Sequence, residues 1–181
     1  MRNVRGLTLI ELMTTVAILA ILMTIGAPGI QRILQQNSVT ADINNLSAAA
    51  RFARFTAIDE EAEVTLCPTA DFSQCTADWQ QNKMVFVDSN ANGSRDANEP
   101  VLSTADAVSK GNSIAGISGA LLFSAHGGID QALTVTVCPS GGSAKDASAL
   151  ITSLYGRIAV AVDSDSNDIK ESSSGADLSC S

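Results

Sequence analysis

Residues 12–30 form a run of nineteen amino acids without a single charged side chain. A helix of this length can span the hydrocarbon core of a membrane, which is about 30 Å thick. The remainder of the chain is rich in serine, threonine, aspartate, asparagine and glycine, and it has few aromatic residues. The sequence therefore predicts one membrane-spanning helix, assigned to residues 7–30, that is joined to a single polar domain.

A short basic leader, residues 1–6, precedes the apolar run. Its charged residues are Arg2 and Arg5, which by the positive-inside rule predict that the N-terminus stays in the cytoplasm. The small residues Ala27 and Gly29 follow the apolar core, so cleavage there by ordinary signal peptidase is an alternative. The position of the basic leader directly before the apolar run argues against that alternative.

Glu11 places a carboxylate inside the apolar segment, where an ionised side chain costs several kcal/mol unless it has a partner. If the chain is cut after Gly6, the new α-amine of Leu7 lies about one helical turn from Glu11. The N-terminus of the helix also favours negative charge. Between packed subunits, the amine of a neighbour can neutralise Glu11 and so set the register. The alternative is an ordinary anchor whose glutamate reaches the cytoplasmic surface.

Helical periodicity continues beyond the apolar run. Apolar residues recur at alternating spacings of three and four along one stripe, namely Ile43, Leu46, Ala50, Ala53 and Ala57. The acidic residues 59–61 oppose the helix dipole, so we expect the helix to end near them. Residues 31–61 are therefore predicted to be an amphipathic extension of the helix, and the small alanines would let a sheet pack closely against it.

After residue 62 the periodicity changes to two, which is typical of β-strands. Short β-type runs, separated by clusters of glycine, serine, asparagine and aspartate, occur at residues 63–67, 84–88, 121–123, 133–138 and 157–162. The predicted fold class is α+β, with a long N-terminal helix packed on an antiparallel β-sheet head over residues 62–181.

The four cysteines, Cys67, Cys75, Cys138 and Cys180, all lie beyond the apolar run. An even number of cysteines in a small, exported, loop-rich head indicates two disulfides, and three connectivities are open. We prefer Cys67–Cys75, which closes a short loop, and Cys138–Cys180, which ties down the C-terminal segment. The spacing disfavours the alternative of a zinc site, because zinc ligands typically come in closely spaced pairs.

Residues 88–99 have the ligand spacing of a calcium-binding loop, with Gly93 at the position of the sharp turn. The candidate ligands are the oxygen-bearing side chains Asp88, Asn90, Asn92, Asp96 and Glu99. The segment lies between predicted strands rather than helices, and Asn-Gly is also a hairpin signal, so a plain polar turn is the alternative. A second acidic segment, residues 163–168, lacks the turn glycine and is predicted to be a solvated turn. No other cofactor is predicted.

The charge of the head limits its partners. From Glu63 onward there are fourteen acidic and six basic side chains, and the whole chain has a formal net charge of −8. Such a domain repels phosphate backbones, so DNA is not an expected partner. His126 is the only histidine, and the sequence supports no catalytic triad, phosphate-binding glycine loop or zinc signature. We therefore predict that the chain is not an enzyme.

Residues 5–12, with the sequence RGLTLIEL, resemble the class III signal of type IV pilins and type II secretion pseudopilins. The resemblance implies that a prepilin peptidase cuts after Gly6 and N-methylates Leu7. It assigns Glu11 to the glutamate used in assembly, and Pro28 to the proline that kinks the helix near the outer edge of the membrane. It also implies a single-pass protein of the bacterial inner membrane, with its head in the periplasm, that is later incorporated into a pilus.

The head resembles the GspH/FimT family of pilins over nearly the whole chain. The similar pieces are Ala53-Arg54, Ala57-Ile58, residues 64–67, Cys75, Trp79, residues 85–88 and Gly156-Arg157. The resemblance implies a minor pilin that primes pilus assembly and contacts other major and minor pilins. Cysteines at 67 and 75 are more similar to the FimT and FimU types than to the secretion pseudopilin, which is kept as an alternative function.

A further alternative is a subunit at the pilus tip that binds DNA or a surface. FimT-type pilins that capture DNA resemble this chain near Gly156-Arg157, where the family has a Gly-Arg-x-Arg element. Here Ala159 stands in place of the second arginine. Together with the acidic balance of the head, this makes phosphate binding doubtful, and Arg157 is expected to be structural or to lie at a subunit contact.

Overall fold

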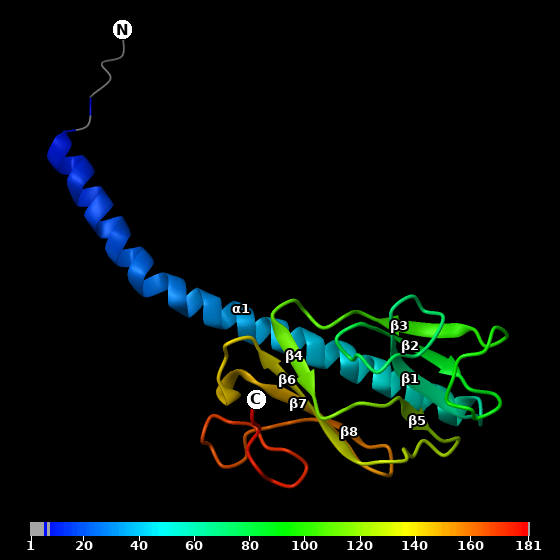
Figure 1. Ribbon diagram of the computed structural model, residues 1–181. Helices are drawn as coiled ribbons and strands as arrows, with labels where there is room; N and C mark the ends of the chain where they lie inside the picture. Colours follow the sequence, from blue (N-terminus) through cyan, green and yellow to red (C-terminus); the bar gives the residue numbers. More distant parts are fainter. Residues whose placement is uncertain (1–5, 7, 181) are drawn as a thin grey trace. The chain divides into compact units, whose positions relative to one another are not determined.

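The computed structural model describes residues 6 and 8–180 (Figure 1). Leu7 and residues 1–5, which belong to the predicted leader and cleavage site, lie outside the described residues. The chain divides into two compact units, residues 1–35 and 36–181, and each is described by itself. One helix, α1 (Leu9–Asp59), contributes to both units.

Both ends of α1 have a local cause. The hydroxyl of Thr8 accepts a hydrogen bond from the backbone N–H of Glu11 at 3.3 Å, as an N-cap residue does. At the other end, Glu61 adopts a left-handed backbone with a φ of 50°. The N–H of Ala62 then donates to the carbonyl of Ala57 at 3.2 Å. This arrangement is a Schellman motif, and it ends the helix close to the predicted acidic boundary.

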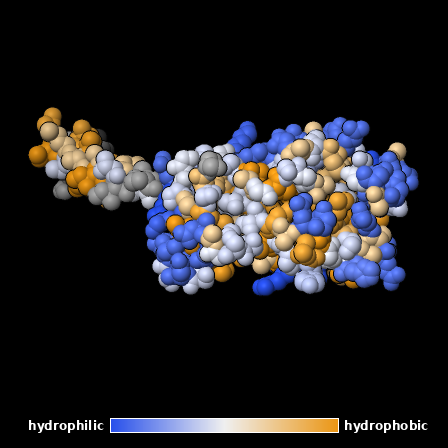
Figure 2. Space-filling model, turned by 60° about the horizontal axis from the view of Figure 1, so that its bottom comes forward, coloured by the Kyte–Doolittle hydropathy of each residue, from blue (hydrophilic) through white to orange (hydrophobic). Residues whose placement is uncertain are grey.

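The first unit contains residues 9–35 of α1, and the helix is continuous through position 28. Its apolar side chains are exposed, among them Leu12, Met13, Val16, Leu19 and Leu22. In Figure 2 the visible face of this part of the helix carries mainly hydrophobic side chains. Within the described part of the chain, α1 is the one helix that is long and apolar enough to cross a membrane.

The second unit contains two four-stranded antiparallel sheets among its described residues. The first sheet has the strand order β3-β2-β1-β5, and the second has the order β4-β6-β7-β8. The strands are β1 (Val64–Thr69), β2 (Asn82–Val87), β3 (Val101–Ala105), β4 (Asn112–Ala115), β5 (Leu121–Phe123), β6 (Leu133–Pro139), β7 (Ser148–Thr152) and β8 (Ile158–Val160). A short 3-10 helix, η1 (Ala144–Asp146), precedes β7.

The core of the head lies between α1 and both sheets (Figure 1). All five residues of the predicted helical stripe are buried, and Ala50, Ala53 and Ala57 are fully inaccessible. They share one hydrophobic cluster with residues of the first sheet, such as Leu66, and of the second sheet, such as Val135. Small side chains on the helix let the sheets approach its backbone closely, so the predicted α+β class is confirmed together with its packing.

The strand predictions were incomplete. Each of the five predicted β-type runs overlaps a strand, but β3, β4 and β7 were not predicted, and the strands form two sheets instead of one. Strand β4 has only four residues, which is too few to establish an alternating pattern. Strand β7 is almost continuously buried, so alternation is absent from its sequence.

A polar contact fixes α1 to the connection between β3 and β4. The carboxylate of Asp42 accepts hydrogen bonds from the hydroxyl of Ser109 at 2.7 Å and from Nδ2 of Asn112 at 2.6 Å. Nearby, the buried Lys83 donates to the carbonyl of Asp106 at 3.2 Å. The pKa of Lys83 lies below its usual value, because burial disfavours the charged ammonium group. The carboxylate of Asp42 and two further aspartates oppose this effect without cancelling it.

Candidate functional sites

The predicted assembly segment begins the described helix. Gly6 and Glu11 are exposed, and Glu11 lies in the first turn of α1. Within the described residues, no hydrogen bond or ion pair engages the Glu11 carboxylate. The spacing Thr8-x-x-Glu11 is that of a capping box, a local signal for the start of a helix. Leu7, the predicted site of methylation, lies outside the described residues, so its distance from Glu11 is not described.

The hydroxyl groups in the apolar part of α1 have partners inside the helix. Thr14, Thr15 and Thr24 each donate to a carbonyl three residues earlier, at distances of 3.0, 2.8 and 2.9 Å. In a hydrocarbon environment these bonds satisfy the hydroxyl protons without a neighbouring chain. Among the described residues, the Glu11 carboxylate has no such partner inside the helix.

The structure joins Cys67 to Cys75 and Cys138 to Cys180, the two pairs preferred from the sequence, with Cα–Cα distances of 5.6 and 5.8 Å. No free cysteine is left to bind a metal among these four. Each bond lies in a small hydrophobic cluster of its own, one with Met84 and Phe86 and the other with Leu178. Side chains alternate between the two faces of a strand, and Leu66 belongs to the cluster that includes α1. Its neighbour Cys67 therefore lies on the opposite face of the sheet.

The predicted calcium loop connects β2 to β3. Its first and last acidic residues, Asp88 and Glu99, are buried, and both hold backbone groups of the loop. Asp88 accepts from the N–H groups of Asn92 at 3.1 Å and Gly93 at 2.6 Å. Glu99 accepts from the N–H groups of Ser89 at 2.8 Å and Asp96 at 2.9 Å. The carboxylates therefore close the loop, as a polar turn also requires.

The middle residues of the loop converge on one point. The side-chain amides of Asn90 and Asn92 both donate to the same oxygen of Asp96, at 2.8 and 3.2 Å. The oxygens of the same two amides accept backbone N–H groups, that of Asn90 from Asn92 at 3.2 Å and that of Asn92 from Ser94 at 2.7 Å. The loop thus brings together oxygen-bearing side chains of the kind that calcium takes, and their polar groups are engaged in hydrogen bonds of the loop itself.

Residues 163–171 repeat several of these bonds in the C-terminal segment. The carboxylate of Asp163 accepts from the N–H of Asp168 at 2.9 Å, and Glu171 accepts from the N–H of Ser164 at 3.0 Å. Asp168 has a left-handed backbone with a φ of 69°, the conformation that Gly93 has in the first loop. Oxygens of Asp163, Asp165 and Glu171 lie within 4.8 Å of one another. The predicted solvated turn is therefore a hydrogen-bonded loop in which Asp163 and Asp165 are exposed and Glu171 is buried.

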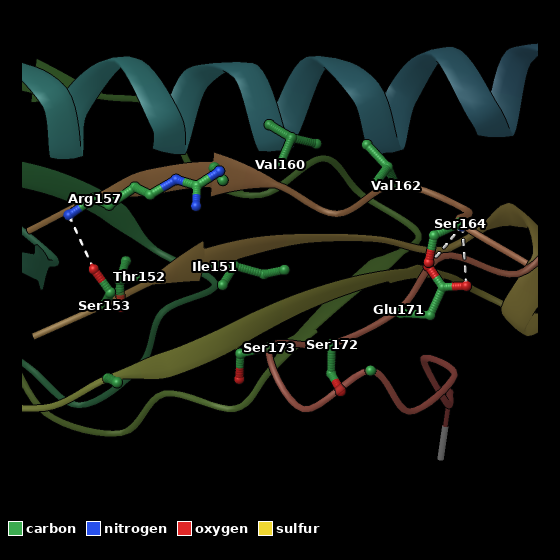
Figure 3. Close-up of a pocket in the computed structure, with 13 residues that line it drawn as sticks. Ile151, Thr152, Ser153, Arg157, Val160, Val162, Ser164, Glu171, Ser172 and Ser173 are labelled. Atoms are coloured by element: carbon green, nitrogen blue, oxygen red, sulfur yellow. Dashed lines mark hydrogen bonds between the residues drawn. The ribbon is translucent and has the colours of Figure 1, made fainter.

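A groove of about 510 Å³ runs along β7 and β8 (Figure 3). Figure 3 shows the apolar side chains of Ile151, Val160 and Val162, with the hydroxyls of Ser172 and Ser173 below them. The residues that line it include several serines but no histidine, and Glu171 is engaged with the backbone of Ser164. The groove therefore has none of the paired groups that a serine nucleophile requires.

The structure places three further residues that the sequence singled out, one of them buried and two exposed. Trp79 is buried in the main core, where its Nε1 donates to the carbonyl of Gly119 at 3.1 Å. His126 is exposed at the turn that precedes Ile129. Arg157 is exposed on the turn into β8, and it lies near Arg51 and Arg54 of α1 in a second groove. That grouping could not be recognised from the sequence, because Arg157 lies about a hundred positions after Arg51 and Arg54.

Two protein-family models match the sequence of this chain. The model described as type II transport protein GspH matches residues 42–154, and the model of the prokaryotic N-terminal methylation motif matches residues 1–27. The first match covers more than half of the chain, so the chain belongs to the GspH family. It is therefore a subunit of the minor pilin and pseudopilin class, as the sequence resemblance indicated, and this family consists of structural subunits.

Two solved structures show the same fold. The type IV minor pilin FimU of Pseudomonas aeruginosa is 17% identical and has a TM-score of 0.55, over 71% of this chain and 91% of FimU. The minor pseudopilin EpsH from the type 2 secretion system of Vibrio cholerae is 9% identical and has a TM-score of 0.51, over 68% of this chain and 95% of EpsH. A comparison with curated protein sequences found no match.

Proposed function

We propose that the chain is a minor type IV pilin that primes pilus assembly. In this proposal residues 1–6 are a leader that prepilin peptidase removes, and residues 7–30 cross the inner membrane once. Residues 31–61 continue the helix, and residues 62–181 form a periplasmic head. After processing, the subunit leaves the membrane for a filament, where it contacts other major and minor pilins.

The observation that carries the proposal is the position of Glu11. It is the only ionisable side chain between residues 8 and 31, and it lies in the first turn of α1 without a partner among the described residues. Hydrolysis of the Gly6–Leu7 peptide bond would consume one water and leave a free α-amine on Leu7. That amine, N-methylated and cationic, is the kind of group that can neutralise a carboxylate in an apolar environment.

Neutralisation between subunits would also select the register. A carboxylate in hydrocarbon costs several kcal/mol when it is unpaired, so a neighbour that arrives out of register is disfavoured by about that amount. Once the pair has formed, the apolar helices are held together by van der Waals packing. This proposal places Glu11 as a positioning residue for assembly and assigns no covalent chemistry to the chain itself.

We expect Glu11→Gln and Glu11→Ala to spare membrane insertion and leader removal but to lower incorporation into filaments by at least about ten-fold, the equivalent of 1.4 kcal/mol. Membrane fractions and sheared pili would be probed for the subunit by immunoblot. Thr24→Ala is the matched control, because its hydroxyl is satisfied within the helix. Normal amounts of the Glu11 variants in sheared pili would contradict the role given to this carboxylate.

Processing is tested separately with Gly6→Ala, which should leave an uncut precursor visible as a slower band. The pilus and secretion alternatives are separated by deleting the gene and measuring piliation and protein secretion in the same strain. Loss of secretion with normal piliation would assign the subunit to a type II secretion pseudopilus instead.

As a second proposal, we infer that residues 88–99 bind calcium. The specific support is the convergence of Asn90, Asn92 and Asp96 inside a loop that is already closed by two buried carboxylates. Preorganised backbone lowers the cost of binding, because less of the loop has to be ordered by the ion. Calcium sites of extracellular modules have dissociation constants of roughly 10⁻⁴ to 10⁻³ M, the range expected here.

Calcium at ten times its dissociation constant should stabilise the head by about 1.4 kcal/mol, measured as a shift of the thermal midpoint together with a heat of binding. Asp96→Ala should abolish both signals, and it disturbs the loop little because this side chain contacts only two asparagine amides. Asp165→Ala is the control in the other acidic loop. If calcium binding is lost in Asp165→Ala but kept in Asp96→Ala, the site has been assigned to the wrong loop.

A further inference from the structure

A groove of about 370 Å³ lies between the C-terminal part of α1 and the turn that joins β7 to β8. We refer to it as the arginine groove. Arg51, Arg54, Phe55 and Ile58 of the helix form one wall, and residues 155–158 form the other. All of these residues belong to the second unit, residues 36–181, so their mutual placement is described within that unit.

Three guanidinium groups lie in this groove without a carboxylate. Arg54 donates from Nε to the carbonyl of Gly127 at 2.9 Å, and Arg51 donates from Nη2 to the carbonyl of Ile158 at 3.4 Å. Within the part of the chain that the structure describes, the side chain of Arg157 has no hydrogen bond. Among residues 6 and 8–180, none of the three forms an ion pair with an acid. Each guanidinium has five N–H donors, so several remain for a ligand.

The rim of the groove is aromatic and apolar. Tyr155 is 88% exposed, Phe55 is 66% exposed and Ile58 is 44% exposed. Arginine and tyrosine together are typical of protein–protein interfaces, where the ring covers apolar area and the guanidinium binds a carboxylate in a bidentate manner. Exposed aromatic and apolar side chains do not stabilise the isolated domain, because they remain in contact with water. Their grouping with three arginines therefore indicates a ligand that has carboxylates and some apolar surface.

The same chain carries a surface of complementary chemistry. Asp59, Glu60 and Glu61 are all exposed at the end of α1, in the turn that closes the Schellman motif. This acidic turn lies about eight residues beyond Arg51 and Arg54, which corresponds to about 12 Å along a helix. A second copy displaced by about 12 Å along the helix axis, with its helix parallel to the first, would therefore bring its acidic turn to the groove.

We propose that the arginine groove binds the acidic turn, residues 59–61, of a second copy of this chain. The two surfaces are different, so the contact is heterologous, and each copy keeps one free groove and one free acidic turn. Such a contact does not close on itself and suits subunits that are stacked along a filament. This inference rests on the proposed function as a filament subunit and adds a charged contact between heads to the one proposed at Glu11.

A nucleic acid would also bring anionic groups to the groove. The fourteen acidic side chains from Glu63 onward oppose the approach of a long polyanion, whereas a turn with three carboxylates meets only the local field of the groove. The observations therefore favour the protein ligand, and binding of DNA is treated as an outcome that overturns the proposal.

The contact can be trapped with cysteines, because all four native cysteines are already paired. Full-length chains with Tyr155→Cys and with Glu60→Cys would be expressed together in cells, and membranes would be oxidised mildly. We expect a disulfide-linked dimer of the two variants, resolved by different tags on the two copies. A chain with Asp130→Cys, an exposed position outside both surfaces, paired with Glu60→Cys is the control that should give no dimer above background.

Charge exchange tests whether the attraction has the proposed sign. Arg51→Glu with Arg157→Glu should lower the dimer yield by about ten-fold, as expected for the loss of two or three charge pairs. Arg54 is kept, because it holds the carbonyl of Gly127. Combining this groove variant with a partner that carries Asp59→Arg and Glu61→Arg beside Glu60→Cys should restore the dimer. Lys110→Glu, the same change of charge at another exposed site, is the control and should have no effect.

The proposal is overturned if no cross-link forms, if the charge reversal leaves it unchanged, or if the exchanged pair fails to restore it. It is also overturned if the full-length chain retains a single-stranded DNA probe in a salt-sensitive manner that Arg51→Glu with Arg157→Glu abolishes. Leader removal and filament incorporation of the same variants are measured in parallel. Processing and incorporation that stay normal while the cross-link fails would overturn the head contact alone and leave the pilin assignment standing.

Discussion

Replacing both Cys138 and Cys180 by serine should lower the free energy of unfolding of the head by about 4 kcal/mol. The bond joins β6 to the C-terminal segment over a sequence separation of 42 residues. A loop of that size loses much chain entropy in the unfolded state when it is closed, so its removal favours unfolding. Urea denaturation of residues 36–181, followed through the fluorescence of Trp79, would measure the change.

The other disulfide provides the matched comparison. Cys67 and Cys75 are separated by only eight residues, so the double serine variant of this pair should cost about 2.5 kcal/mol by the same entropy argument. The head is suited to this test because its described core clusters lie entirely within residues 39–180. Equal losses for the two pairs would show that chain entropy does not dominate, and that packing around each bond decides its contribution.

Gly156→Ala should destabilise the head by about 3 kcal/mol or more, through two effects that act together. Gly156 has a left-handed backbone with a φ of 71°, which a residue with a Cβ adopts only at a cost. A Cβ at this position would also collide with the carbonyl of Gly127 and lie 2.6 Å from Nε of Arg54. Those two groups are hydrogen-bonded to each other, so neither can move away without loss.

Gly175→Ala separates the two effects. Gly175 has a similar φ of 81°, but a Cβ there would meet no atom within 4 Å. It should therefore cost only about 1 kcal/mol, the expense of the backbone conformation. The same urea denaturation measures both variants. If the two substitutions have the same effect, close packing between the β7–β8 turn and α1 contributes nothing, and the arginine groove has a looser wall than its geometry indicates.

The parts of the fold that could be predicted are those encoded locally. The stripe from Ile43 to Ala57 has the period of a helix over four turns, and residues 133–138 alternate cleanly, so both could be assigned from the sequence. The partition into two sheets could not, because it depends on pairings between distant residues, such as Leu66 with Leu121 and Val137 with Ser148. No short hairpin turn joins either pair of strands, so neither register could be read from the turn between them.

Strand β7 illustrates a second reason for failure. Its end residues Ser148 and Thr152 are polar but buried, and a polar residue is ordinarily taken as exposed. The hydroxyl of Thr152 accepts from the N–H of Leu133 at 3.2 Å, so its burial is compensated by a partner on the neighbouring strand. That partner is nineteen positions away and cannot be recognised without the fold.

The candidate sites divide along the same line. The assembly signal around Glu11 and the loop at residues 88–99 are continuous segments, so residue spacing was sufficient to propose them. The arginine groove was missed, because it is made when α1 packs beside a turn that follows it by about a hundred residues. The sequence predicts that Arg157 is structural or lies at a subunit contact. The structure places it in one groove with Arg51 and Arg54.

The sequence separations of the two disulfides also determine the order in which these bonds can form during synthesis of the protein. Cys75 follows Cys67 by eight residues, so the first bond can form while most of the second sheet has yet to be synthesised. Cys138 must wait for a further 42 residues before its partner exists. The bond next to β1 can therefore form early and the bond that ties β6 to the C-terminal segment late, with an interval in which β6 and β7 are held only by noncovalent contacts. Enzymes that oxidise thiols or degrade unfinished proteins would meet the head during that interval, and the second bond is the one that ends it.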